Sequence, residues 1–223
     1  MTEIGSSLDQ YQEVETGKAF TLQGPRLLKV ELSETSVIAK NGAMVAYQGD
    51  VRFEHKGGGL GRFVKKAIGE SLSLMQAEGS GELFLAYQAM LVHSLELKDD
   101  SITVNGENIL AFETGIDWDV TRVKGGTAGV LAGGLFNIHL SGTGLVALVS
   151  DGEPVRLDVG EAPTFADPQA AIAWSGGVST KLKSEVQAKT LIGLGSGESF
   201  QLGFSGQGWV LVQPSEGRPR PGA

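Results

Sequence analysis

The stretch that decides the fold class is Ser199-Phe-Gln-Leu-Gly-Phe-Ser-Gly-Gln-Gly-Trp-Val-Leu-Val-Gln213. Two apolar runs with alternating side chains flank the segment from Ser205 to Gly208, and this combination of strand pattern and glycine turn predicts a β-hairpin. The same design occurs twice more, from Leu72 to Ala86 and from Leu135 to Val149. Three similar hairpins in one chain predict an all-β protein.

Glycine pairs mark an internal repeat. They occur at Gly79/Gly81, Gly142/Gly144 and Gly206/Gly208, so successive pairs are 63 and 64 residues apart. A second landmark, an aliphatic residue followed by alanine and an aromatic residue, precedes each pair and ends at Tyr47, Phe112 and Trp174, with spacings of 65 and 62 residues. Two landmarks that share one period predict three pseudo-repeats of about 63 residues.

Composition supports one compact β body. The 33 glycines follow no collagen-like period, so we assign them to tight turns between short strands, and a hydrophobic content of 41% is enough for a core. We therefore predict a single-domain β-sandwich or barrel over residues 11–217, in which three units share one core with pseudo-threefold symmetry. Residues 1–10 and 218–223 are expected to be flexible ends.

Several protein classes are disfavoured. The chain has no cysteine, which excludes disulfides and thiolate metal sites and suits a reducing cytoplasm. The N-terminus lacks the pattern of a secretory signal, and no run of about 18 apolar residues predicts a membrane-spanning helix. A net charge of −8 makes nucleic acid an unfavoured partner. We expect a cytoplasmic protein, with peripheral membrane attachment left open.

No catalytic or cofactor constellation is visible. His55, His93 and His139 occupy unmatched positions in the repeats, so neither a metal site nor any cofactor is predicted. Gly142-Thr-Gly-Leu-Val-Ala147 superficially matches a dinucleotide fingerprint, but a strand follows where that motif needs a helix. Asp117 and Asp119 would share a strand face like paired carboxylates, and an exposed strand face explains them better. We expect no enzyme activity.

The segments that precede the predicted hairpins are strongly basic. These connectors span residues 55–69, 121–134 and 180–193 and contain one acid, Glu185, against nine basic residues. Their charge of +8 leaves −16 for the rest of the chain, so the molecule is expected to be electrically polarised. The candidate surface for an anionic partner consists of Lys56, Arg62, Lys65, Lys66, Arg122, Lys124, Lys181, Lys183 and Lys189.

The first connector has a helical pattern. Leu60, Phe63, Val64, Ala67 and Ile68 fall on one side of a helix, with the basic residues opposite, which predicts a short helical connector. The favoured interpretation is that the apolar stripe packs back on the sheet. Contact with an anionic membrane, or with the acidic face of another subunit, stays open.

A family resemblance covers nearly the whole chain. The blocks Ser36 to Gly49, Leu110 to Glu113, Gly133 to Asn137, Gly195 to Glu198 and Gln213 to Gly217 resemble bacterial members of the altered-inheritance-of-mitochondria family, number twenty-four. The resemblance implies a β-rich fold related to the tryptophan RNA-binding attenuation protein, with jelly-roll-like topology. It supplies no catalytic residues.

Together these features favour a non-enzymatic interaction or scaffold protein. The expected partner is an unknown protein, and an anionic membrane surface and a homo-oligomer stay open as further partners. The alternatives are an RNA-binding β module, which the scarcity of connector aromatics weakens, and a jelly roll that binds a small ligand.

Overall fold

The computed structural model describes residues 8–33, 35–55, 73–122, 136–184 and 200–216. The predicted all-β class, with large antiparallel sheets, is confirmed. The strands are β1 (Phe20–Leu22), β2 (Leu28–Glu31), β3 (Val37–Lys40), β4 (Met44–His55), β5 (Leu74–Leu85), β6 (Leu91–Asn105), β7 (Ile109–Glu113), β8 (Asp117–Arg122), β9 (Phe136–Ser150), β10 (Val155–Val159), β11 (Thr164–Ala166), β12 (Ala171–Ser175), β13 (Val178–Ser184), β14 (Phe200–Gly206) and β15 (Gly208–Val212). Within the described residues, the one helix is the 3-10 turn η1 (Asp9–Tyr11).

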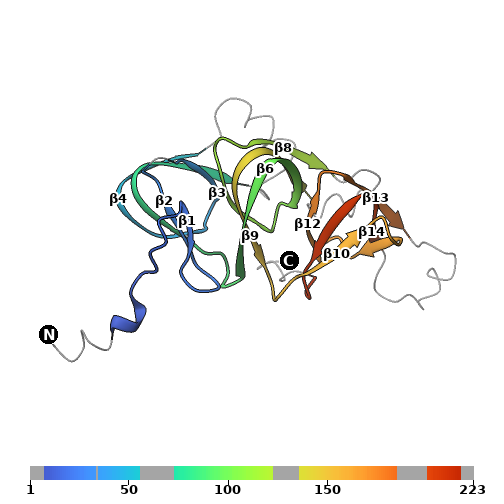
Figure 1. Ribbon diagram of the computed structural model, residues 1–223, viewed down its shortest axis with the longest axis horizontal. Coiled ribbons are helices and arrows are strands. Elements are labelled where there is room, and N and C mark those ends of the chain that lie inside the picture. The colour runs from blue at the N-terminus through green and yellow to red at the C-terminus, as the bar shows by residue number, and fades with distance from the viewer. Residues whose placement is uncertain (1–7, 34, 56–72, 123–135, 185–199, 217–223) are drawn as a thin grey trace.

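The strands form two sheets. The 12-stranded sheet follows the order β1-β2-β5-β3-β7-β9-β6-β12-β15-β10, with β4 paired to β5 and β8 paired to β9, and the 3-stranded sheet follows the order β11-β14-β13. Figure 1 shows three groups of curved strands in a row along the long axis, in the order in which the chain makes them. The molecule is therefore elongated, with its first and last strands at opposite ends.

The glycine pairs lie inside long strands, so the hairpin prediction is wrong. β5 runs unbroken through Gly79 and Gly81, and β9 runs unbroken through Gly142 and Gly144. In the third copy only Gln207 separates β14 from β15. Glycine at position 79 has a φ of 130°, and a Cβ there would overlap the backbone carbonyl oxygen of Asp50 on the neighbouring strand β4. The pair thus serves a close approach of two strands and not a chain reversal.

Three strand pairs that contain a glycine-pair segment have a register shift in the partner strand. β4 pairs with β5 and shifts register between Met44 and Ala46. β7 pairs with β9 and shifts between Ile109 and Ala111, and β12 pairs with β15 and shifts between Ala171 and Ala173. An extra residue at each point increases the local twist and bends the strand.

Three apolar clusters replace the single shared core that we predicted. The first contains Leu28, Val30 and Leu83, the second contains Phe112, Ile138 and Leu148, and the third contains Trp174, Phe204 and Val210. The first two clusters exchange side chains at their boundary, because Ile38 of β3 belongs to the second cluster and Leu110 of β7 belongs to the first. Elements in a row cannot all reach one centre, so each group of strands buries its own apolar face.

Some predictions fall outside the described residues. They are the short helical connector predicted within residues 55–69, of which only residue 55 is described, and the tail at 218–223, while of the predicted flexible N-terminus only residues 8–10 are described. The sandwich or barrel over residues 11–217 as one domain therefore stays a prediction.

Candidate interaction surfaces

Only part of the predicted basic surface can be located. Lys181 and Lys183 lie on β13, and Arg122 is the last residue of β8, with a side chain that lies outside the description. Six predicted residues lie wholly outside the described ranges: Lys56, Arg62, Lys65, Lys66, Lys124 and Lys189. The third connector consequently begins later than we expected, because its first residues complete a strand.

The two located lysines share one exposed strand face. Residues at alternate positions point to the same side of a strand, and Lys181 and Lys183 are both exposed while Leu182 between them is buried. The ammonium nitrogen of Lys183 lies 4.7 Å from the ring centre of Phe165 on β11, a cation–π contact across β14. Phe165 is 44% exposed. Sequence reasoning missed it because its three-residue strand has too little pattern to be recognised.

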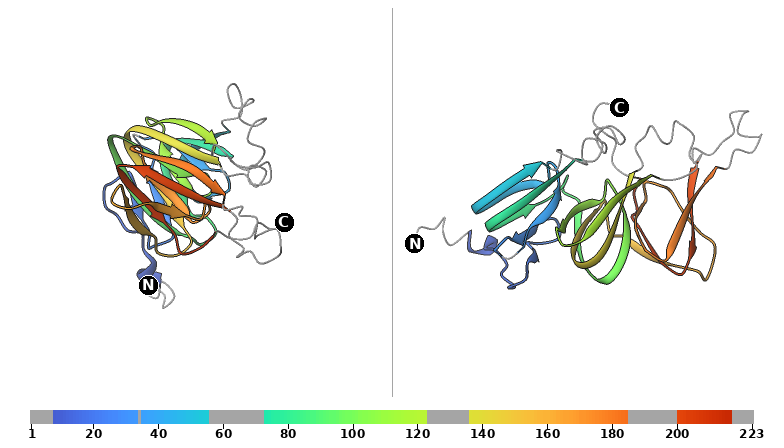
Figure 2. Two further views of the ribbon diagram at one scale, coloured as in Figure 1. Left: turned by 90° about the vertical axis from the view of Figure 1, so that its right-hand side faces the viewer. Right: turned by 90° about the horizontal axis from the view of Figure 1, so that it is seen from above.

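The strand ends that flank the basic connectors lie on one side of the molecule. The ends concerned are those of β4 and β5, of β8 and β9, and of β13 and β14. Both views in Figure 2 place these three pairs of strand ends on the same long side of the row of strands. Antiparallel pairing explains why the two strand ends beside each connector lie together, because each basic segment joins the end of one strand to the start of its neighbour.

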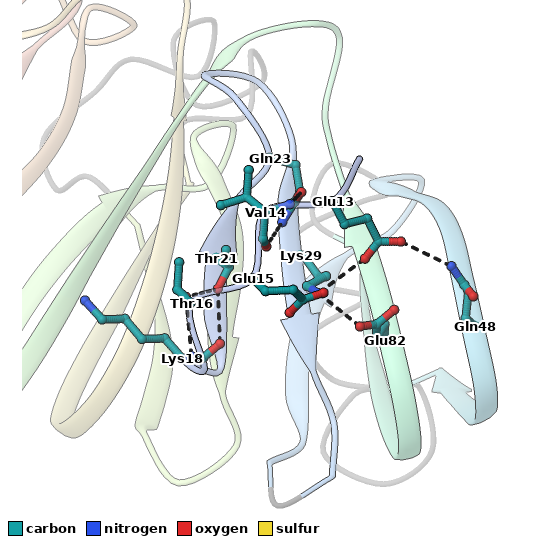
Figure 3. Close-up of polar contacts among 10 residues, drawn as sticks. All are labelled: Glu13, Val14, Glu15, Thr16, Lys18, Thr21, Gln23, Lys29, Gln48 and Glu82. Carbon is teal, nitrogen blue, oxygen red and sulfur yellow. Dashed lines mark hydrogen bonds and ion pairs between the residues drawn. The ribbon is translucent and has the colours of Figure 1, made fainter. Parts of the chain in front are cut away.

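A buried lysine forms the densest charge cluster. The ammonium group of Lys29 on β2 lies 2.6 Å from a carboxylate oxygen of Glu15, 3.0 Å from one of Glu82 and 3.2 Å from one of Glu13 (Figure 3). Burial of Lys29 lowers its pKa, but the three hydrogen bonds outweigh this effect and hold the pKa above its usual value. These three carboxylates are also close enough together to hold a cation, and the lysine ammonium already serves as that cation.

The cluster links the segment that directly precedes β1 to the sheet. Glu13 and Glu15 precede β1, whereas Glu82 belongs to β5, and Glu13 also accepts a 3.4 Å hydrogen bond from the side-chain amide of Gln48 on β4. Lys29 donates all three ammonium protons, so its arrangement suits structure and not proton transfer. The signal in the sequence was a lysine inside the apolar run that begins at Leu27.

The two histidine side chains that the structure describes, those of His93 and His139, make separate contacts. His93 donates from Nε2 to the hydroxyl of Ser150, which donates in turn to the carbonyl of Gly152. Burial lowers the pKa of His93 more than the nearby Glu153 raises it. His139 is partly buried, with Nδ1 3.2 Å from the Thr103 hydroxyl, and the His55 side chain lies outside the description.

Asp117 and Asp119 are both exposed on β8. Their exposure agrees with our preferred interpretation of an open strand face. Within the described residues, the one group of potential metal-ligating side chains is the cluster around Lys29, to which neither aspartate belongs.

Large apolar side chains are exposed at the two ends of the row. Met44, Val45 and Tyr47 lie on β4 in the first group of strands, and Val155, Leu157 and Phe165 lie on β10 and β11 in the last group. Figure 1 shows these strand groups at opposite ends of the molecule. The other exposed large apolar residues are Leu8, Tyr11, Val14 and Leu22, all in or near the N-terminal segment. None of the described helical residues forms a segment with the length and apolar character needed to cross a membrane.

Comparisons with known proteins agree on the family and the fold. The family model described as "Mitochondrial biogenesis AIM24" matches residues 20–215. Among solved structures, the X-ray crystal structure of a protein from Streptococcus pyogenes is 25% identical and superposes with a TM-score of 0.70, over 88% of this chain and 92% of that chain. No curated protein matches the sequence.

Proposed function

This chain belongs to the mitochondrial biogenesis AIM24 family, and from that premise we propose that it is a non-enzymatic interaction protein whose basic connectors bind an anionic membrane surface. The family description names a process and no reaction. One observation supports the proposal most directly: the strand ends that flank the three connectors lie on the same side of the molecule.

Charge separation supports this orientation. The connectors carry +8 and the remainder of the chain −16, so an anionic surface attracts one side of the molecule and repels the rest. Lys181 and Lys183 continue this basic character onto the exposed face of β13. Each basic residue held near an anionic bilayer contributes about 1 kcal/mol, so the nine basic residues of the connectors provide enough attraction for reversible binding.

Liposome co-sedimentation tests the proposal. The protein should sediment with vesicles that contain phosphatidylserine and stay in solution with neutral phosphatidylcholine vesicles, and added salt should weaken the binding. The double substitution Lys65→Glu plus Lys66→Glu should lower the binding constant by about tenfold or more. Lys18→Glu plus Lys98→Glu makes the same charge change at exposed positions outside the connectors and should have a smaller effect. Equal losses in the two variants would reject a connector-specific contact.

We also propose that the body consists of three equivalent units. Tyr47, Phe112 and Trp174 pair with Leu83, Val146 and Val210, each of which lies four residues after the first glycine of its pair. The bulges in β4, β7 and β12 precede these aromatic residues by the same distance. A common register and a common irregularity support common descent of the units, because bulges are specific features of a strand pairing.

Single-stranded RNA is a second candidate partner, favoured by one observation. Phe165 is exposed beside Lys181 and Lys183, which combines a surface for base stacking with positive charge. Filter binding with an unstructured RNA tests it: Phe165→Ala should reduce retention severalfold, and absence of retention at low salt would exclude this candidate.

A further inference from the structure

Neighbouring units are joined by one repeated strand pairing. At the first junction, β3 pairs with β7 and Ile38 lies opposite Phe112. At the second, β6 pairs with β12 and Thr103 lies opposite Trp174. Both pairings are antiparallel, and in both the residue opposite the aromatic pairs on its other side with a residue three positions before a glycine pair, Gln76 or His139. The junction is thus the same contact used twice.

Each end of the row carries one half of this junction. At the first end, β4 supplies the strand that corresponds to β7 and β12, and among the described strands it pairs with β5 alone. At the last end, β11 corresponds to β3, since Phe165 pairs with Gly203, three positions before Gly206. The described strands give β11 one neighbour, β14. The head of the row, β4, and its tail, β11, are therefore complementary halves.

The exposed side chains at the head show which residues a further paired strand would bury. Tyr47 is 49% exposed, whereas the corresponding Phe112 and Trp174 are 0% and 3% exposed. Val45 is 58% exposed, whereas its counterparts Leu110 and Ile172 are fully buried. Their chemistry suits burial in all three units. Only the first unit lacks a preceding unit to supply it.

Burial at the tail follows the same rule. Phe165 is exposed, whereas Ile38, at the corresponding position of the first unit, is buried. On β10, Val155 and Leu157 are exposed, while Leu28 and Val30 hold the matching positions on β2 and pack in a cluster with Leu110 from the next unit. The last unit lacks the following unit that would cover these side chains. Among the described residues, six of the ten exposed large apolar side chains are thus accounted for by the two open ends.

From these observations, and resting on the three-unit proposal, we propose that the head of one molecule binds the tail of a second copy, with β4 pairing along β11. The register of the internal junctions places Tyr47 of one copy opposite Phe165 of the next. Such a contact joins two different surfaces, so it leaves a free head and a free tail after each addition. The assembly is a closed ring if the rotation between copies closes and a filament if it does not.

The second copy is favoured over an unrelated partner by complementarity within the chain itself. The head offers Met44, Val45 and Tyr47, and the tail offers Val155, Leu157 and Phe165, and among the described strands β4 and β11 each have a strand neighbour on one side only. An open strand edge is a template for another strand, and proteins that must stay monomeric protect such edges with charge or proline. Residues 44–49 of the head strand contain neither.

Sedimentation velocity with blocked ends tests the proposal on the full-length protein. The variants are Tyr47→Lys at the head, Phe165→Lys at the tail, and Leu22→Lys as a matched control at an exposed apolar residue outside both ends. Each substituted position is exposed, so the fold should be retained, which thermal unfolding verifies. Wild type and Leu22→Lys should associate as concentration rises, and each end variant should weaken association by at least about 30-fold.

Mixing the two end variants gives the decisive result. The Tyr47→Lys variant keeps a free tail and the Phe165→Lys variant keeps a free head, so an equimolar mixture should form a dimer and nothing larger. A wild type that is monomeric at every concentration, an end variant that still dimerises alone, or a mixture that stays monomeric would each overturn the proposal. Liposome binding is scored separately with Lys65→Glu plus Lys66→Glu, so failure of the membrane proposal leaves this test unaffected.

Discussion

At the scale of single residues, Lys29 shows how a charge can be accommodated inside a sheet. Its side chain is fully buried, yet each ammonium proton is donated to a carboxylate that keeps contact with solvent. The partners come from two distant parts of the chain, so the ion cluster holds the segment before β1 against β5. Such a cluster fixes the position of the segment before β1, and the loss of protein stability when the cluster is disrupted should be measurable.

Replacing Lys29 by methionine should destabilise the protein by about 2–4 kcal/mol, because three carboxylates then face one another without a cation. The partial exposure of the glutamates keeps the effect at the lower end of that range. Lys98→Met, which removes an exposed pair with Glu96, should cost less than about 1 kcal/mol. Urea unfolding of the two variants measures the difference, and similar losses would contradict a special role for Lys29.

The pH dependence of this effect has a defined sign. Because the folded-state pKa of Lys29 is raised above its ordinary value of 10.5, its contribution is fully present below that pH and is lost only as pH rises through the folded-state pKa. The stability difference between wild type and Lys29→Met should therefore show no loss from this group between neutral pH and about pH 10.

At the scale of elements, the glycine pairs set the shape of the long strands. Gly79 and Gly81 on β5 face the backbone of β4, where any Cβ would overlap a carbonyl oxygen of Asp50 or Gln48. Gly142 on β9 has a similar positive φ of 118°, but open space surrounds the position of its missing Cβ. The first glycine of the pair is thus required for different reasons in the two strands, close contact at Gly79 and backbone conformation at Gly142.

Alanine substitutions should separate these two requirements. Gly79→Ala forces the two strands apart and should cost about 4 kcal/mol or more, whereas Gly142→Ala pays only for its backbone conformation, about 1–2 kcal/mol. Chemical denaturation gives both values. Equal costs would mean that strand contact does not explain the glycine at position 79.

The sequence predicted elements well where the pattern is local. Alternation of apolar and polar residues together with many glycines correctly predicted the all-β class. It failed at the glycine pairs, because a positive φ inside a strand and one in a turn demand the same residue. It also placed Lys181 and Lys183 in a connector, since the pairing of β13 with β14 joins distant parts of the chain.

At the scale of the whole molecule, two features of the row have consequences beyond one unit. The strand ends beside the basic connectors lie on one long side, and among the described strands β4 and β11, at the two ends of the row, each pair with one neighbour. The charge of the connectors could be counted from the sequence, whereas the exposure of the apolar residues at the two ends could not be predicted from it. Tyr47, Phe112 and Trp174 look equivalent in sequence, and only the structure distinguishes the one that lacks a cover.

Head-to-tail assembly would strengthen attachment to a membrane. Copies joined end to end present their connector sides together, so several weak electrostatic contacts act as one. The Tyr47→Lys variant should therefore bind phosphatidylserine vesicles more weakly than the Leu22→Lys control, which carries the same added charge and the same connectors, and liposome co-sedimentation below saturation measures this. Identical binding by the two proteins would show that assembly does not contribute.

Disulfide crosslinking tests the proposed junction most directly. The chain has no cysteine, so Tyr47→Cys and Phe165→Cys introduce single reactive positions without background. Directly opposed residues of antiparallel strands have Cα atoms about 4.5–5.5 Å apart, within the range that a disulfide bridges. Oxidation of a mixture of the two variants should give a covalent dimer of one copy of each, whereas Tyr47→Cys mixed with Leu22→Cys should give none. Failure of the first mixture to crosslink, or equal crosslinking by either variant alone, would contradict the head-to-tail arrangement.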